Sequence, residues 1–143
     1  MEQRDYLMRQ IEQLGEVLAV MLARLLGIKQ KGDKSLGLEE LRQTYKNELD
    51  LDVEELITIP REEIIETFLK KNKLMEHHLE TIAELLQATG ENLIRNDRVG
   101  DGNHILEQSL YILEYLQTTT KIYSVNRMMK IEYLKEMLKE EKF

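Results

Sequence analysis

The chain has 143 residues, a formal net charge of −7 and no cysteine or tryptophan. This length suits one domain, which we expect over residues 1–143, and it permits a core without disulfides or a structural metal. The missing cysteine excludes thiol catalysis and zinc ribbons, and the acidic balance argues against nucleic-acid binding, which needs a basic face.

The composition favours helix along the whole chain. There is one proline and there are seven glycines, and 33% of the residues are charged. No run of β-branched residues alternates with the period of a strand. We therefore predict an all-α fold of about six helices in antiparallel pairs, arranged as a short solenoid or an irregular bundle.

The first predicted helix spans residues 5–26, with Asp5 as its N-cap and Gly27 at its end. Its apolar residues are spaced four and three apart, which makes a continuous seam: Leu7, Ile11, Leu14, Leu18, Met21, Leu25 and Ile28. The seam can pack inside the chain or pair with a second copy as a short coiled coil. We favour packing inside the chain, and keep a homodimer through the remaining flank of this helix as an alternative.

The middle of the chain predicts two shorter helices. One covers residues 38–49, with Leu38, Leu41, Tyr45 and Leu49 on its buried face. Residues 50–59 are the least regular stretch, with a single turn expected at 53–56. Pro60 then suits the first position of a helix that ends near residues 71–73, because its missing N–H is not needed there.

Three further helices are expected in the second half. The first spans residues 74–96, and Arg98 to Gly102 reads as a turn. Asn103 is expected to cap the next helix, which ends near residues 118–120 and is apolar on two sides, while Ser124 is expected to cap the last one. Residues 140–143 are expected to fray. The predicted core is Leu14, Leu18, Met21, Leu25, Ile82, Leu85, Leu106, Leu110 and Leu113, and Met128 is expected to face inward with Ile131, Leu134 and Leu138.

One group of side chains has spacing suited to metal binding. His77, Glu80 and Glu84 fall on one helix face, where two carboxylates and an imidazole could hold a metal ion. The alternative is a surface pair between His77 and Glu80, with His78 partly buried. We favour that alternative, and we expect no catalytic residue, no metal and no cofactor.

Tyrosines suggest a different kind of site. Tyr111 and Tyr115 lie four residues apart, on a flank between two leucine stripes. Tyrosine on a half-exposed helix face is favoured at protein contacts, although buried tyrosines with satisfied hydroxyls are the other interpretation. Tyr111 and Tyr115, together with His78, are therefore the candidate interaction surface.

Several stretches resemble tetratricopeptide-type helix pairs. These are Leu14-Gly15, Thr89-Gly90 near the end of the 74–96 helix, Gly100-Asp101 and the run Ile112-Leu113-Glu114. The opening IEQLGEVLAVMLARLLG resembles a family of small bacterial tetratricopeptide-like proteins. The resemblance implies antiparallel helix pairs stacked into a right-handed solenoid. The family has no assigned reaction, so the resemblance implies no site residues.

The favoured function is a non-catalytic protein-interaction module for a protein or peptide partner. Ten acidic residues against three basic ones between Gly37 and Glu66 would also suit a basic partner, unless these charges are only solvated. The acidic start is unlike a signal peptide, and no apolar run reaches the length of a membrane span. We expect a cytoplasmic protein.

Overall fold

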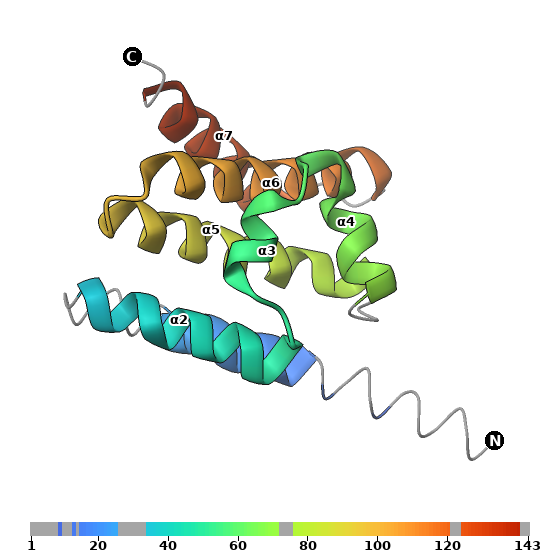
Figure 1. The fold of residues 1–143 in the computed structure, drawn as a ribbon. Coiled ribbons are helices and arrows are strands. Elements are labelled where there is room, and N and C mark those ends of the chain that lie inside the picture. Colours follow the sequence, from blue (N-terminus) through green and yellow to red (C-terminus); the bar gives the residue numbers. More distant parts are fainter. Residues whose placement is uncertain are drawn as a thin grey trace.

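A computed structural model describes residues 9, 13, 15–25, 34–71, 76–120 and 124–140 (Figure 1). The described residues are helical with short connections and contain no strand, which confirms the all-α prediction. Residues 15–25 and helix α2 lie at the bottom of the view, α5 and α6 form the middle and α7 lies at the top. Among the helices that are described, none has the length and apolar character needed to cross a membrane.

The helical segment at residues 15–25 and α2 (Lys34–Leu49) bury the faces that the sequence predicts. Leu18 and Met21 have no exposed surface, and Tyr45 of α2 is equally buried. Leu7, Ile11, Leu14 and Ile28 of the seam lie outside the described residues. Asp50 ends α2 by adopting a positive φ of 49°, while the Leu51 amide donates to the Tyr45 carbonyl. This is the usual left-handed helix stop, made here by aspartate rather than glycine.

The stretch predicted as irregular is a second short helix. Helix α3 (Val53–Thr58) is capped by Asp52, whose carboxylate accepts from the Glu54 amide at 2.9 Å. Its Val53 and Leu56 are fully buried, which stabilises six residues as helix where one turn was expected. Pro60 then precedes a 3₁₀ turn (Arg61–Glu63), α4 (Ile64–Glu66) and a π-helical turn (Thr67–Lys71), which together form the predicted short helix.

Helices α5 (Leu79–Arg95) and α6 (Val99–Thr119) form a tight antiparallel hairpin. Gly90 and Gly102 face each other, and a Cβ built on Gly102 would lie 2.6 Å from the Gly90 carbonyl oxygen. Further along, the Ser109 hydroxyl donates to the Ala83 carbonyl at 2.6 Å. The backbones can approach this closely only because neither glycine carries a side chain.

The predicted turn at 98–102 and the predicted cap at Asn103 are wrong. The chain turns earlier, at Asn96 to Arg98, because Asp97 takes a positive φ of 66° and the Arg98 amide donates to the Leu93 carbonyl. Both Gly100 and Gly102 therefore belong to the first turns of α6. Gly102 permits close packing of α6 on α5. In the sequence, a glycine with this role cannot be distinguished from a glycine in a turn.

The α-helix predicted over residues 74–96 begins later in the structure, at Leu79. A 3₁₀ turn (Glu76–His78) precedes α5, and residues 74 and 75 lie outside the described part of the chain.

Helix α7 (Val125–Glu140) packs on α6. The Ser124 hydroxyl accepts from the Arg127 amide, which confirms the predicted cap. Ile131 and Leu134 face inward as expected. Met128 does not, because 40% of its surface is exposed. Residues 141–143, most of the stretch expected to fray, lie outside the described residues.

Polar contacts hold the α3–α4 region against α6. The buried Gln108 amide donates to the Leu56 and Ile59 carbonyls at 2.9 Å each, and His104 Nε2 donates to Ile59 at 2.7 Å. Nearby, Arg98 donates to both carboxylate oxygens of Glu54. These bonds fix the chain from α3 to α4 along one side of α6.

Candidate functional site

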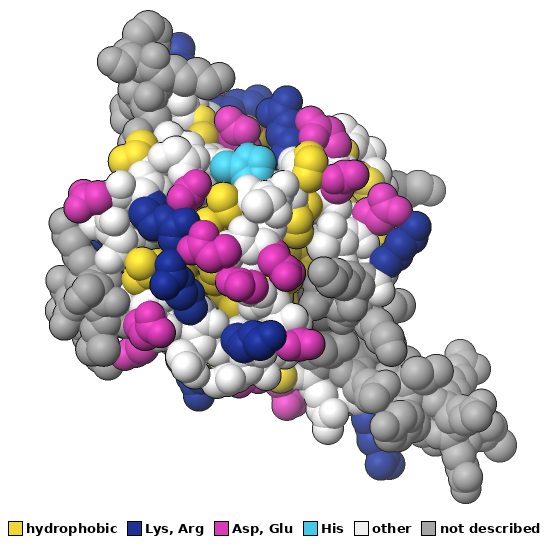
Figure 2. All heavy atoms as spheres, viewed as in Figure 1, with side chains coloured by type: hydrophobic (Ala, Val, Ile, Leu, Met, Phe, Trp, Pro, Cys, Tyr) yellow, Lys and Arg dark blue, Asp and Glu magenta, His cyan; other side chains and the backbone are white. Residues whose placement is uncertain are grey.

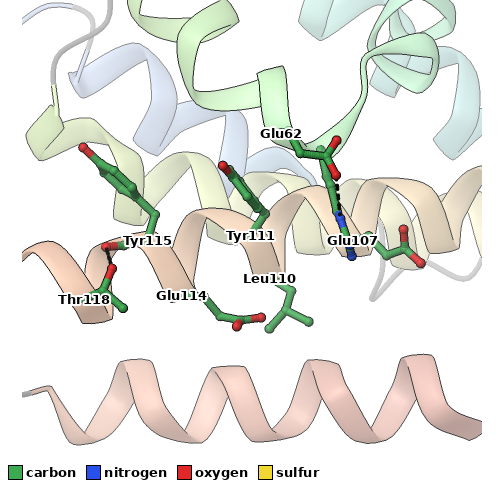
Figure 3. Close-up of a pocket in the computed structure, with 8 residues that line it drawn as sticks. Glu62, Glu107, Leu110, Tyr111, Glu114, Tyr115 and Thr118 are labelled. Atoms are coloured by element: carbon green, nitrogen blue, oxygen red, sulfur yellow. Dashed lines mark hydrogen bonds and ion pairs between the residues drawn. The ribbon is translucent and has the colours of Figure 1, made fainter.

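Two adjoining hollows lie between α6 and the segment from Arg61 to Lys70, with volumes of about 560 and 350 Å³. Both are bordered by Glu62, Tyr111 and Tyr115, so we treat them as one feature, the tyrosine groove. In Figure 3, Tyr111 and Tyr115 rise from α6 on the side of Glu62. The larger hollow is lined by Arg61, Glu62, Glu107, Leu110, Tyr111, Glu114, Tyr115 and Thr118.

One face of α6 supplies most of these side chains. Glu107, Leu110, Tyr111, Glu114, Tyr115 and Thr118 recur at spacings of three and four, which places them on one side of a helix. Across from them, Ile65 and Leu69 complete an apolar strip in the smaller hollow. The groove therefore combines an aromatic and aliphatic floor with a rim of carboxylates.

Acidic groups dominate the rim. Glu62 pairs with Arg61 at 3.2 Å, and Glu66 pairs with Lys70 at 2.7 Å. A backbone hydrogen bond and then the Arg61 guanidinium lower the pKa of Glu62, and the Lys70 ammonium lowers that of Glu66. Both basic side chains of the groove are thus already engaged. Glu107 and Glu114 form no ion pair with any described residue, which leaves the groove with excess negative charge.

Tyr111 and Tyr115 are half-buried, a state intermediate between the two interpretations of the tyrosines. Their rings pack against the core, yet they line open space. The Tyr115 hydroxyl donates to a Glu76 carboxylate oxygen at 3.1 Å, and this bond raises the pKa of the phenol. This hydrogen bond holds the Tyr115 ring in place in the groove.

Leu110 and His78 lie elsewhere than the sequence indicates. Leu110 was expected in the core, but it is only partly buried, because its position on α6 borders the groove. His78 does not line the groove at all. It is 5% exposed, and a Cβ on Gly15 would lie 3.5 Å from its Nε2, so its ring packs under the N-terminal helical segment.

The structure separates the residues considered for a metal site. Glu80 pairs with Arg127 at 2.5 Å, and Glu84 pairs with Lys130, both on α7. His77 is exposed, with its ring centroid 4.2 Å from that of His78. The described residues hold no group of three or more histidine or acidic side chains that could bind a metal ion. The predicted pair between His77 and Glu80 is replaced by the α5–α7 ion pairs.

Sequence reasoning missed the far wall of the groove. Ile65, Leu69 and Glu62 form this wall, and none of the three was predicted to line a binding site. No local signal shows that this segment faces Tyr111, because the alignment depends on the long-range bonds from His104 and Gln108 to Ile59.

The surface that covers α2, α3 and α4 is of mixed charge. In Figure 2, basic and acidic side chains alternate over this face, and hydrophobic side chains show between them rather than as one broad patch.

Comparison with protein-family models, with curated proteins and with solved structures gives no match to this chain.

Proposed function

We propose that this protein is a non-catalytic protein-interaction module whose tyrosine groove binds a segment of a partner protein. The observation that carries the proposal is the pair Tyr111 and Tyr115, half-exposed on the floor of the groove. Tyrosine buries a large area at little cost in side-chain entropy, and it is enriched among the residues that dominate binding energy.

The surroundings of the two rings support the same proposal. Leu110, Ile65 and Leu69 offer apolar contacts beside them, and carboxylates at the rim can orient a partner. Partner segments commonly bind such grooves through a few apolar anchors. The resemblance to tetratricopeptide-like proteins, which also remains a proposal, is consistent with a helical scaffold used for binding.

Selection from a library of random peptides tests this function. We expect enriched peptides to bind the wild-type protein and to lose about tenfold or more in affinity when Tyr111→Ala and Tyr115→Ala are combined. Tyr133→Ala is the matched control, because Tyr133 lies on α7 and is 49% exposed. Circular dichroism confirms that each variant is folded. Enriched peptides that bind the double variant as tightly as the wild type would refute the proposal.

A second candidate function is self-association through the flank of the N-terminal helical segment. Val20 favours it, because 48% of its surface is exposed while Leu18 and Met21 beside it are fully buried. Sedimentation equilibrium over a concentration series tests it. A dimer that is abolished by Val20→Glu but kept by Val125→Glu, at an exposed site on α7, supports this candidate. A monomer at every concentration eliminates it.

A further inference from the structure

The outer face of α6 carries two carboxylates in a fixed register. Glu107 and Glu114 are seven residues apart and both line the larger hollow, with Leu110 and Tyr111 between them along the helix (Figure 3). Seven residues are two turns, so the Cα atoms of the two glutamates are separated by about 10.5 Å along the helix axis. A rigid helix holds this spacing constant.

The charges near these glutamates leave them available to a partner. Arg61 and Lys70, the basic residues of the groove, are paired with Glu62 and Glu66. Neither Glu107 nor Glu114 has an ion-pair partner among the described residues. The carboxylates of Glu107 and Glu114 could therefore pair with basic residues of a bound segment, one at each end of the apolar floor.

We propose that the tyrosine groove selects an amphipathic helix that carries basic residues at positions i and i+7, with apolar residues at i+3 and i+4. This inference rests on the proposed function and specifies the partner's chemistry. Such a helix repeats the spacing of α6, so each basic residue reaches one glutamate while the apolar residues meet Leu110 and the tyrosine rings. The contacting face of α6 runs from Glu107 to Thr118, about three turns, which matches the length of a short helical segment.

Alternative occupants fit less well. An acidic helix would meet four carboxylates at the rim, Glu62, Glu66, Glu107 and Glu114. A basic helix with its charges at i and i+5 would direct them about 140° apart, so that only one could reach the rim. Both serve as comparison peptides.

The test uses labelled synthetic peptides of about 18 residues, long enough to form helix in an alanine- and glutamine-rich background. One peptide has lysines at i and i+7, one has the same composition with lysines at i and i+5, and one has glutamates at i and i+7. All carry leucines at i+3 and i+4. Binding is measured by fluorescence anisotropy, after circular dichroism shows that the helix contents match.

We expect the i,i+7 lysine peptide to bind about two- to fivefold more tightly than the i,i+5 peptide, which can form only one of the two ion pairs, and more tightly still than the glutamate peptide. The preference should shrink at about 0.5 M salt, where exposed charges are screened. It should disappear in the combined variant Glu107→Gln and Glu114→Gln. It should persist in Glu132→Gln with Glu136→Gln, which removes the same number of charges from exposed positions on α7, outside the groove.

Equal binding of the two lysine peptides, or a preference that survives loss of Glu107 and Glu114, would overturn the register inference. The proposed function fails separately, when library peptides bind independently of Tyr111 and Tyr115. Library peptides that depend on the tyrosines but lack paired basic residues would leave the function standing and refute this inference alone.

Discussion

The two faces of α6 differ in almost every physical respect. The inner face meets α5 through Gly102 and Ser109 and meets α3 through the fully buried Gln108. The outer face presents Glu107, Tyr111, Glu114 and Tyr115 to a groove, all at least partly exposed. The inner face of α6 is thus in van der Waals contact with its neighbours. The outer face makes fewer contacts with the rest of the fold.

In this arrangement the inner face of α6 stabilises the fold, and the outer face is the one that the proposed binding uses. Residues on the inner face are in close contact with the backbone of α5, so even small changes there should be costly. Tyr111 and Tyr115 on the outer face bury part of their area against the core and leave the rest exposed. If the inner face alone stabilises the fold, substitutions there should lower the free energy of unfolding much more than substitutions on the outer face.

Gly102→Ala should give the largest effect. The new Cβ would lie 2.6 Å from the Gly90 carbonyl oxygen and from Ile94 Cγ1, so α5 and α6 must move apart. We expect a loss of about 1–3 kcal/mol in the free energy of unfolding, measured by urea denaturation.

Gly100→Ala is the internal control for that measurement. It makes the same change two residues away, where a Cβ would meet nothing within 4 Å. We expect this variant to be unchanged or up to about 1 kcal/mol more stable, because alanine favours helix. Equal losses at both positions would mean that the glycine contact does not limit the packing of α5 on α6.

Gln108→Leu should have the next largest effect. It removes two hydrogen bonds, to the Leu56 and Ile59 carbonyls, from a fully buried site. The loss should be about 1–2 kcal/mol, because His104 still donates to Ile59 and the Ile59 amide still donates to Leu56. Gln43→Leu, the same change at an exposed position of α2, should be nearly neutral in the same denaturation experiment.

The sequence predicts the helices better than their ends. Leu18, Met21, Ile82 and Leu85 are buried as their spacing indicates, because a periodic apolar stripe has only one stable location in water. The turn between α5 and α6 was misplaced because Asp97, not a glycine, adopts the left-handed conformation. Aspartate takes that conformation far less often than glycine, so Gly100 and Gly102 gave the stronger but misleading signal.

The candidate site was predictable only in part. Tyr111 and Tyr115 were identified because their spacing placed both on one flank of a helix. His78 was wrongly added, because its burial depends on Gly15, which is more than sixty residues away in the sequence. Contacts of this kind, like the bonds from Gln108 to the end of α3, depend on tertiary packing that local periodicity does not describe.

Acid should reveal a smaller effect at the junction of α3 and α6. Hydrogen bonds from Arg98, with a further contribution from Arg42, hold the pKa of Glu54 below its ordinary value. The stabilisation is therefore present above the unfolded-state pKa of about 4.3 and is lost as the pH falls through the lower folded-state pKa. Because the Glu54 side chain is 47% exposed, we expect less than about 1 kcal/mol at neutral pH.

The measurement compares the wild type with Glu54→Gln by urea denaturation between about pH 3 and pH 7. The difference in stability should be constant above about pH 5 and should narrow below that. Glu39→Gln, at an exposed site on α2, controls for the change in net charge. A difference that does not change with pH would show that the Glu54–Arg98 contact adds no stability through its charge.

The smallest effect on stability should come from the outer face of α6. Glu107→Gln combined with Glu114→Gln removes two charges that no described residue pairs with, so we expect the free energy of unfolding to stay within about 0.5 kcal/mol of the wild type. A slight gain is expected, because the groove already carries Glu62 and Glu66 and the repulsion among carboxylates falls. A loss comparable to that of Gly102→Ala would mean that both faces of α6 serve the fold, and the outer glutamates would then be structural residues rather than candidates for recognition.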